Sequence, residues 1–87
     1  MHEAPCIRLR ILLFSVLRER IGQRELEIAL PAPVTGDRLL DYLAEQYPVI
    51  ATYRSVIRLA VNQTYVPTSV ELHEKDEIAL ITPVSGG

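Results

Sequence analysis

An alternating stretch near the start of the chain decides the fold: Ile7-Arg8-Leu9-Arg10-Ile11-Leu12-Leu13-Phe14. Successive side chains of a strand point to opposite faces, so every second residue from Ile7 onward would share one apolar face. The other face would carry Arg8, Arg10, Leu12 and Phe14, and it therefore begins charged and ends apolar. A face that met only solvent would not end in this way. The stretch predicts a strand with a core face and a second face that changes character along its length.

Two elements are predicted directly after this strand. Residues 15–21 can form a short helix, which Gly22 would close in the left-handed conformation that ends many helices. Residues 24–30 alternate again and predict a second strand, which the prolines after it would end.

The main helix is predicted to run from Thr35 to about residue 47. Thr35 can cap it, and Asp37 lies in the first turn, where the helix dipole favours a negative charge. One apolar stripe repeats at helical spacing, formed by Leu39, Leu40, Leu43 and Tyr47. Pro48 would prevent the helix from continuing, and we expect residues 49–55 to be irregular.

The remainder of the chain predicts strands and turns. A strand is expected over residues 56–62, followed by a turn at 62–64 and a short return strand at 65–66. Another short strand is expected around residues 70–72, and the last strand over 77–83.

The order of these elements is strand, short helix, strand, helix, strand, short strands, strand. It lacks a regular strand–helix rhythm, which favours an α+β roll with a mixed sheet packed on one main helix. This is the order of the ubiquitin-like β-grasp fold, in which the first and last strands pair in parallel. With 87 residues there is no room for a second core, so we expect one domain over residues 1–87. A flexible tail is expected over about residues 83–87.

Composition excludes several classes of function. Nine Lys and Arg face eleven Asp and Glu, a net charge of −2 that argues against binding nucleic acid through its phosphates. The one cysteine, Cys6, excludes an internal disulfide and a Cys-based zinc site. His2 and His73 have no second ligand at metal spacing, so no metal is expected. The start of the chain does not resemble a secretory signal and no apolar run reaches the ~18 residues of a membrane span, which predicts a cytoplasmic protein.

The sequence contains no clear set of catalytic residues, and we expect the chain not to catalyse a reaction alone. Its informative feature is the ending Pro83-Val84-Ser85-Gly86-Gly87. Glycine lacks a Cβ, so the last two residues can enter a narrow channel. The terminal carboxylate can be adenylated by an ATP-dependent partner, after which sulfur or an amine can displace AMP. A frayed terminus is the alternative explanation of the same residues.

The outer face of the predicted sheet points to a partner. If the first and last strands pair in parallel, charged residues gather at one end, with Arg8 or Arg10 near Glu77. An apolar patch gathers at the other end, beside the tail, and its predicted members are Leu12, Phe14, Ile81 and Pro83. An exposed apolar patch of this kind is typical of a protein–protein interface, and it could also let the isolated chain self-associate.

Two segments resemble the small subunit of molybdopterin synthase, a family of β-grasp sulfur carriers. Residues 13–22 read Leu-Phe-Ser-Val-Leu-Arg-Glu-Arg-Ile-Gly, similar to the family's Phe-Ala-x-x-Arg-Glu-x-x-Gly stretch. Residues 76–87 read Asp-Glu-Ile-Ala-Leu-Ile-Thr-Pro-Val-Ser-Gly-Gly, similar to its Gly-Asp-Glu-Val-Ala-x-x-Pro-Pro-Val-Ser-Gly-Gly ending. The resemblance spans about residues 7–87. Two departures are Lys75, where the family has glycine in a turn, and Thr82, where it has the first of two prolines.

The resemblance implies a function. Gly87 would be adenylated with ATP by an E1-like activating enzyme and converted to a thiocarboxylate, with no bound cofactor. The tail would enter the large catalytic subunit of a heterotetramer, with Gly86 and Gly87 in the channel and Val84 and Ser85 guiding them. Sulfur would pass there to cyclic pyranopterin monophosphate. The residues implied in the partner interface are Phe14, Arg18, Ile81 and Pro83.

Three other functions share features with this one. Sulfur carriers for thiamine or for tRNA thiolation have the same fold and ending, although thiamine-type carriers are shorter and lack the segment over residues 14–22. A ubiquitin-like modifier would join Gly87 to a lysine through an isopeptide bond. An interaction module with an inert tail would need neither reaction.

Overall fold

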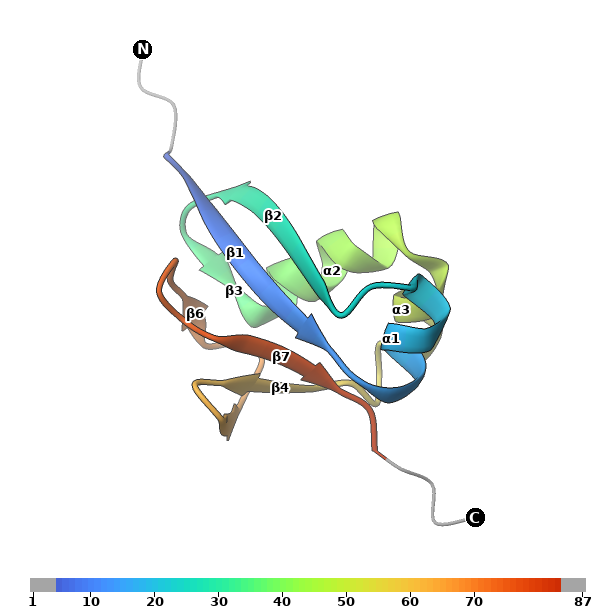
Figure 1. The fold of residues 1–87 in the computed structure, drawn as a ribbon. Coiled ribbons are helices and arrows are strands. Elements are labelled where there is room, and N and C mark those ends of the chain that lie inside the picture. Colours follow the sequence, from blue (N-terminus) through green and yellow to red (C-terminus); the bar gives the residue numbers. More distant parts are fainter. Residues whose placement is uncertain (1–4, 84–87) are drawn as a thin grey trace.

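A five-stranded mixed sheet organises the computed structural model, which describes residues 5–83 (Figure 1). The strand order across the sheet is β2-β1-β7-β4-β5. The first strand pairs in parallel with the last, and every other neighbouring pair is antiparallel. The strands are β1 (Cys6–Leu13), β2 (Glu25–Pro31), β4 (Arg58–Val61), β5 (Thr64–Val66) and β7 (Ile78–Ile81). The predicted α+β β-grasp roll and its parallel pairing are confirmed. The four residues after Pro83, in which the predicted tail falls, lie outside the described part.

Three helices and a small second sheet complete the part of the chain that the structure describes. The helices are α1 (Ser15–Ile21), α2 (Gly36–Gln46) and α3 (Pro48–Tyr53). The small sheet pairs β3 (Val34–Thr35) with β6 (Glu71–Leu72). In Figure 1, α2 crosses behind the large sheet, and α1 lies at the end where β1 finishes. None of the helices described over residues 5–83 is long and apolar enough to cross a membrane.

The core lies between the sheet and α2. In β1 the alternation seen in the sequence becomes alternating burial, with Leu9, Ile11 and Leu13 inward and the arginines outward. The apolar stripe of α2 packs on them, and its leucines at 39, 40 and 43 are fully buried. Burial of one such leucine stabilises the fold by about 2 kcal/mol, so this layer supplies most of the hydrophobic stabilisation.

The start of α2 is fixed by a cap and by a close contact. The Thr35 hydroxyl accepts a hydrogen bond from the Arg38 backbone N–H at 3.2 Å, as the sequence predicts for a cap. A Cβ on Gly36 would lie 2.5 Å from Cδ2 of Leu59 and 2.7 Å from the backbone oxygen of Thr68. Only glycine therefore lets the helix begin this close to β4.

The prediction of irregular structure over residues 49–55 is wrong. Pro48 ends α2 but occupies the first turn of α3, a position where its missing N–H and fixed φ suit a helix. Ile50 is fully buried and anchors this helix to the core. The Arg54 guanidinium then ties α3 to α2, with Nη2 3.1 Å from Oδ1 of Asp41.

Two predicted strands are shorter than expected, and the lysine that replaces the family's glycine fits its turn. The strand expected over residues 56–62 begins at Arg58, because the N–H groups of Val56 and Ile57 donate to the Tyr53 carbonyl and close α3. The last strand spans Ile78–Ile81 only. Lys75 is not among the residues with positive φ, so lysine does not strain the turn in which it stands.

Candidate functional site: the outer face of the sheet

The face of the sheet turned away from α2 carries an unbroken row of apolar residues. The strand register places Leu12 of β1 beside Ala79 of β7, Ala79 beside Ala60 of β4, and Ala60 beside Tyr65 of β5. These residues alternate with the buried inner ones, so all four side chains share the outer face. No helix packs on this side of the row in Figure 1.

The row forms a shallow groove of about 330 Å³, which we call the outer groove. Its base is low because Ala60 and Ala79 carry only methyl groups and are 6% and 9% exposed. Larger side chains stand on either side, with Phe14 42% and Tyr65 59% exposed. The lining residues are Leu12, Phe14, Ala60, Gln63, Tyr65, Glu77, Ala79 and Ile81. Large apolar groups beside an apolar depression are typical of a protein–protein contact rather than of an enclosed active site.

The end of β7 and the residues that follow it up to Pro83 lie beside this groove. Because β1 and β7 run parallel, with Leu13 opposite Leu80, Phe14 and Ile81 lie at the same end of the sheet. Thr82 is buried and Pro83 is exposed, so the chain emerges from the body at Pro83. The predicted patch is thus assembled: the structure brings Leu12, Phe14 and Ile81 together, with Pro83 just beyond.

An unusual backbone conformation holds Phe14 at the surface. Ser15 has φ +50°, in the left-handed region that residues other than glycine rarely adopt. Ser15 is the first residue of α1, and it directly follows Phe14, whose backbone is extended (φ −132°, ψ 161°). This sharp turn ends β1 and leaves the Phe14 ring partly exposed. Strain of this kind is kept where the surrounding structure fixes it, often at functional sites.

Arg18 is exposed on α1, one helical turn after Phe14. Its backbone N–H donates to the Phe14 carbonyl at 3.4 Å, and its carbonyl accepts from Gly22 at 2.9 Å. Gly22 closes the helix with φ +81°, in the left-handed region as predicted. Arg18 therefore lies one helical turn from Phe14, with its side chain exposed.

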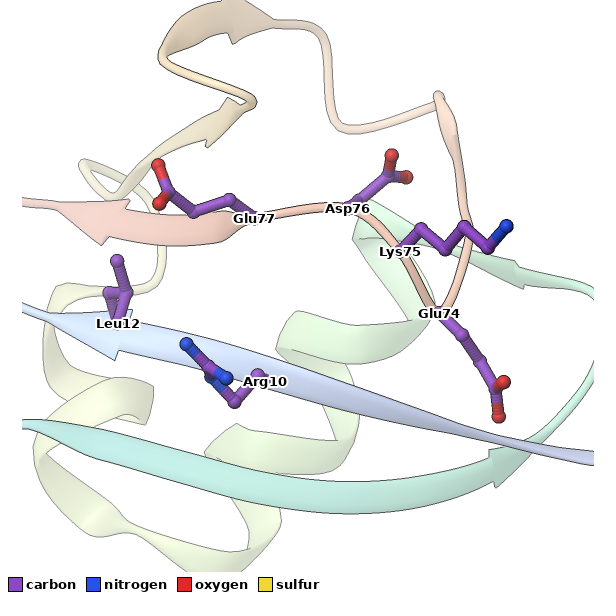
Figure 2. A pocket seen from close by; sticks show the side chains of 6 residues that line it. All are labelled: Arg10, Leu12, Glu74, Lys75, Asp76 and Glu77. Carbon is purple, nitrogen blue, oxygen red and sulfur yellow. The ribbon is translucent and has the colours of Figure 1, made fainter.

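Charge gathers at the opposite end of the outer face, as the sequence predicts. A hollow of about 180 Å³ lies between β1 and the turn before β7, and Figure 2 shows the side chains that line it. Its lining residues are Arg10, Leu12, Glu74, Lys75, Asp76 and Glu77. Arg10 shares this hollow with Glu77, but its ion pair is with Glu25 of β2, with Nε 3.3 Å from Oε1. The labelled side chains of Glu74, Lys75 and Asp76 fan away from one another, so they do not converge on a ligand.

One asparagine fixes the start of β7 and so the position of the groove. The Asn62 side-chain oxygen accepts from the Glu77 N–H at 3.0 Å, and its amide nitrogen donates to Oδ1 of Asp76 at 3.1 Å. The Asn62 N–H also donates to the Glu77 carbonyl at 2.8 Å. Both Asn62 and Gln63 have positive φ, 52° and 67°, as a two-residue turn between antiparallel strands requires.

The outer groove contains residues that the sequence prediction omitted. Ala60, Gln63 and Tyr65 line it, and none of them was predicted as a site residue. The sequence feature that could have identified them is the two-residue turn after β4, because it sets the β4–β5 register and places Tyr65 opposite Ala60. The predicted tail residues Val84, Ser85, Gly86 and Gly87 lie outside the described part. Between residues 5 and 83 no three His, Cys, Asp or Glu side chains cluster closely enough to hold a metal ion.

A β-grasp body with an apolar outer face beside Pro83, the last described residue, has the architecture of a ubiquitin-like protein. Sequence comparison makes the identification specific. The ThiS family model matches residues 11–87, and the chain belongs to the ThiS family. Within it, the chain groups with the molybdopterin synthase sulfur carrier subunits, which confirms the resemblance stated from the sequence.

Curated relatives with that name include one from Dictyostelium discoideum and one from Arabidopsis thaliana. The one from Dictyostelium discoideum is 41% identical over 81 residues, which cover 90% of this chain and 94% of the relative. The one from Arabidopsis thaliana is 35% identical over 85 residues, which cover 98% of this chain and 88% of the relative.

Solved structures share the fold. The crystal structure of SAMP1 from Haloferax volcanii is 27% identical with a TM-score of 0.75, and the match covers 92% of this chain and 99% of that one. A complex of subunits 1 and 2 of molybdopterin-converting factor from Helicobacter pylori also matches. It is 18% identical with a TM-score of 0.62, covering 93% of this chain and 100% of that one.

Proposed function

We propose that this chain is the sulfur-carrying small subunit of a molybdopterin synthase, with sulfur carried on the carboxyl carbon of Gly87. The curated relatives with that name, matched over nearly their whole length, carry the proposal. The structure supports it through an apolar outer face beside the point where the C-terminal segment leaves the body. The chain would work in the cytoplasm.

Loading would take place in two steps. The Gly87 carboxylate attacks the α-phosphate of ATP on an E1-like activating enzyme, forms an acyl adenylate and releases pyrophosphate. A sulfur nucleophile then displaces AMP and leaves a thiocarboxylate. The missing Cβ atoms of Gly86 and Gly87 let both residues pass through a narrow channel, with Val84 and Ser85 guiding them.

Transfer would take place in the large catalytic subunit. Phe14, Ile81 and Pro83 would pack against that subunit, with Arg18 at the edge of the contact. The loaded tail would reach cyclic pyranopterin monophosphate there and give up its sulfur. Because a dithiolene contains two sulfur atoms, two loaded carriers must act for each product, which suits a heterotetramer with a small subunit at each end. The acid–base groups would belong to the large subunit, so this chain would not catalyse the transfer alone.

The test is a reconstituted synthesis of molybdopterin. Chain loaded by the activating enzyme, ATP and a sulfur donor is mixed with the large subunit and cyclic pyranopterin monophosphate. The wild-type chain and a Glu45→Gln control, changed on the exposed side of α2, should both give product. A chain that lacks Gly86 and Gly87 should give none. Equal product from the shortened chain would overturn the proposal.

A modifier role is the alternative, and a second measurement, in the native host, distinguishes it. SAMP1, the small archaeal modifier protein 1, shares the fold. Both functions begin with the adenylate, so they separate only afterwards. Isopeptide conjugates of Gly87 in the native host, found together with no transfer to the pyranopterin, would favour the modifier.

A further inference from the structure

Arg58 is the first residue of β4 and lies on the outer face, next to the outer groove. The register places it opposite Ile81 of β7, and strand alternation puts it on the same side as Ala60. It thus stands at the same end of the sheet as Phe14 and Pro83. A partner that covers Ile81 must also approach Arg58.

The Arg58 guanidinium lies over an aromatic ring. Its Cζ lies 5.8 Å from the centroid of the Tyr65 ring, within the range of a cation–π contact. Tyr65 is the most exposed of the large hydrophobic residues in the described part, at 59%. The pair therefore presents a flat apolar ring and a positioned cation together at the β5 edge.

Arg58 also lacks a counter-charge within residues 5–83. Arg10 is paired with Glu25, and Arg54 is paired with Asp37 and Asp41. No ion pair found in this part of the chain includes Arg58. Covering an unpaired charge with apolar surface is unfavourable, because the charge loses its water without gaining a partner. A surface that binds over Ile81 would therefore gain affinity by supplying an acceptor for the guanidinium.

We propose that Arg58, positioned by Tyr65, binds a carboxylate side chain of the large catalytic subunit and so helps to select that partner. This inference rests on the proposed function, since it names the chemistry of the same interface. Arginine suits the role because its planar fork can hold a carboxylate through two parallel hydrogen bonds. The contact would lie at the rim of the apolar groove, where charges chiefly control the rate of association and its dependence on salt.

The experiment measures binding of the full-length chain to the purified large subunit by calorimetry and by association kinetics, at low and at high salt. Arg58→Glu should weaken binding about tenfold at low salt, mainly through slower association, and should flatten the salt dependence. Arg38→Glu is the matched control, because it makes the same change in charge on α2 and should change affinity less than twofold. Tyr65→Leu keeps an apolar side chain but removes the ring, and it should weaken binding about threefold. Thermal unfolding of each variant checks that the fold is retained.

Each result separates this inference from the proposed function. Binding of Arg58→Glu within twofold of wild type would overturn the inference, as would an equal loss in Arg38→Glu, which would indicate non-specific attraction. In both cases the proposed function would still be supported if the wild-type chain binds the large subunit and Phe14→Asp abolishes that binding. Failure of the wild-type chain to bind the large subunit would overturn both.

Discussion

The two faces of the large sheet come from the same strands but differ in what covers them. On the inner face, Leu80 of β7 is fully buried beneath α2, whereas Ile81, the next residue, is only half-buried on the outer face. On the outer side, alanines lie between larger exposed groups and leave a groove. Within residues 5–83, the chain thus covers one of these two apolar faces and leaves the other open.

This difference shows which apolar residues fold the chain and which are left for another molecule. An apolar face that serves only stability would be covered within the chain, because an exposed apolar side chain does not contribute the free energy gained when it is removed from water. The outer face keeps large side chains exposed, and β7, which carries both faces, leads directly to the C-terminus. Variants that act on one face and not on the other test this division.

The largest effect is expected from Leu80→Ala compared with its neighbour Ile81→Ala. Leu80→Ala should lower the free energy of unfolding by about 3 kcal/mol, because it leaves a cavity in the core. Ile81→Ala should lower it by less than about 1 kcal/mol but weaken binding to the large subunit. Urea denaturation measures the first effect and calorimetry the second. Equal losses of stability would contradict the division between the faces.

The contact between α2 and the inner face should be nearly as sensitive. Gly36→Ala would place a methyl group against Leu59 and the Thr68 carbonyl. Overpacking of this kind should lower the free energy of unfolding by about 2 kcal/mol. Ala44→Gly, in the same helix, should cost only about 1 kcal/mol through helix propensity and provides the comparison. An unchanged melting curve for Gly36→Ala would show that the helix can move away from β4.

Filling the outer groove should affect binding and leave stability nearly unchanged. Ala79→Leu would occupy the groove between Leu12 and Tyr65 without entering the core. Ala79 is only 9% exposed, but the added atoms would enter the groove rather than the core. We therefore expect a change in unfolding free energy below about 1 kcal/mol and about tenfold weaker binding to the large subunit. Ala29→Leu, on the exposed side of β2, is the control and should bind normally. Wild-type affinity of Ala79→Leu would mean that the partner does not use the groove.

The smallest effect is expected at the rim of the groove. Gln63 has φ +67°, where glycine is favoured over other residues. Gln63→Gly should therefore raise the free energy of unfolding by about 0.5 kcal/mol. Gln63→Val, which is β-branched, should lower it by about 1 kcal/mol in the same urea titration. A loss of stability in the glycine variant would show that the Gln63 side chain contributes more than its backbone strain costs.

Local pattern and turn chemistry allowed much of the fold to be predicted. The alternation around Leu9 and Ile11 identified both faces of β1, and Thr35 and Gly22 marked where helices begin and end. The parallel pairing of β1 and β7 followed from the order of the elements. These features depend on residues close together in sequence or on topology.

The errors came from tertiary contacts and register. Pro48 was interpreted as a stop signal, although burial of Ile50 lets it begin another helix. Arg10 lies near Glu77 in one hollow, as predicted, but its ion pair with Glu25 was not predicted, because it depends on β2 lying alongside β1. Tyr65 was seen only as part of a short return strand. Its place in the groove appears once the two-residue turn fixes its partner as Ala60.

The central claim is that Gly87 carries sulfur, and the most direct measurement is the intact mass of the chain after incubation with the activating enzyme, ATP and a sulfur donor. We predict a mass increase equal to the replacement of one oxygen atom by sulfur, located at Gly87 by fragmentation and absent when the enzyme is omitted. An unchanged mass in the presence of an enzyme that loads a known carrier would contradict the account.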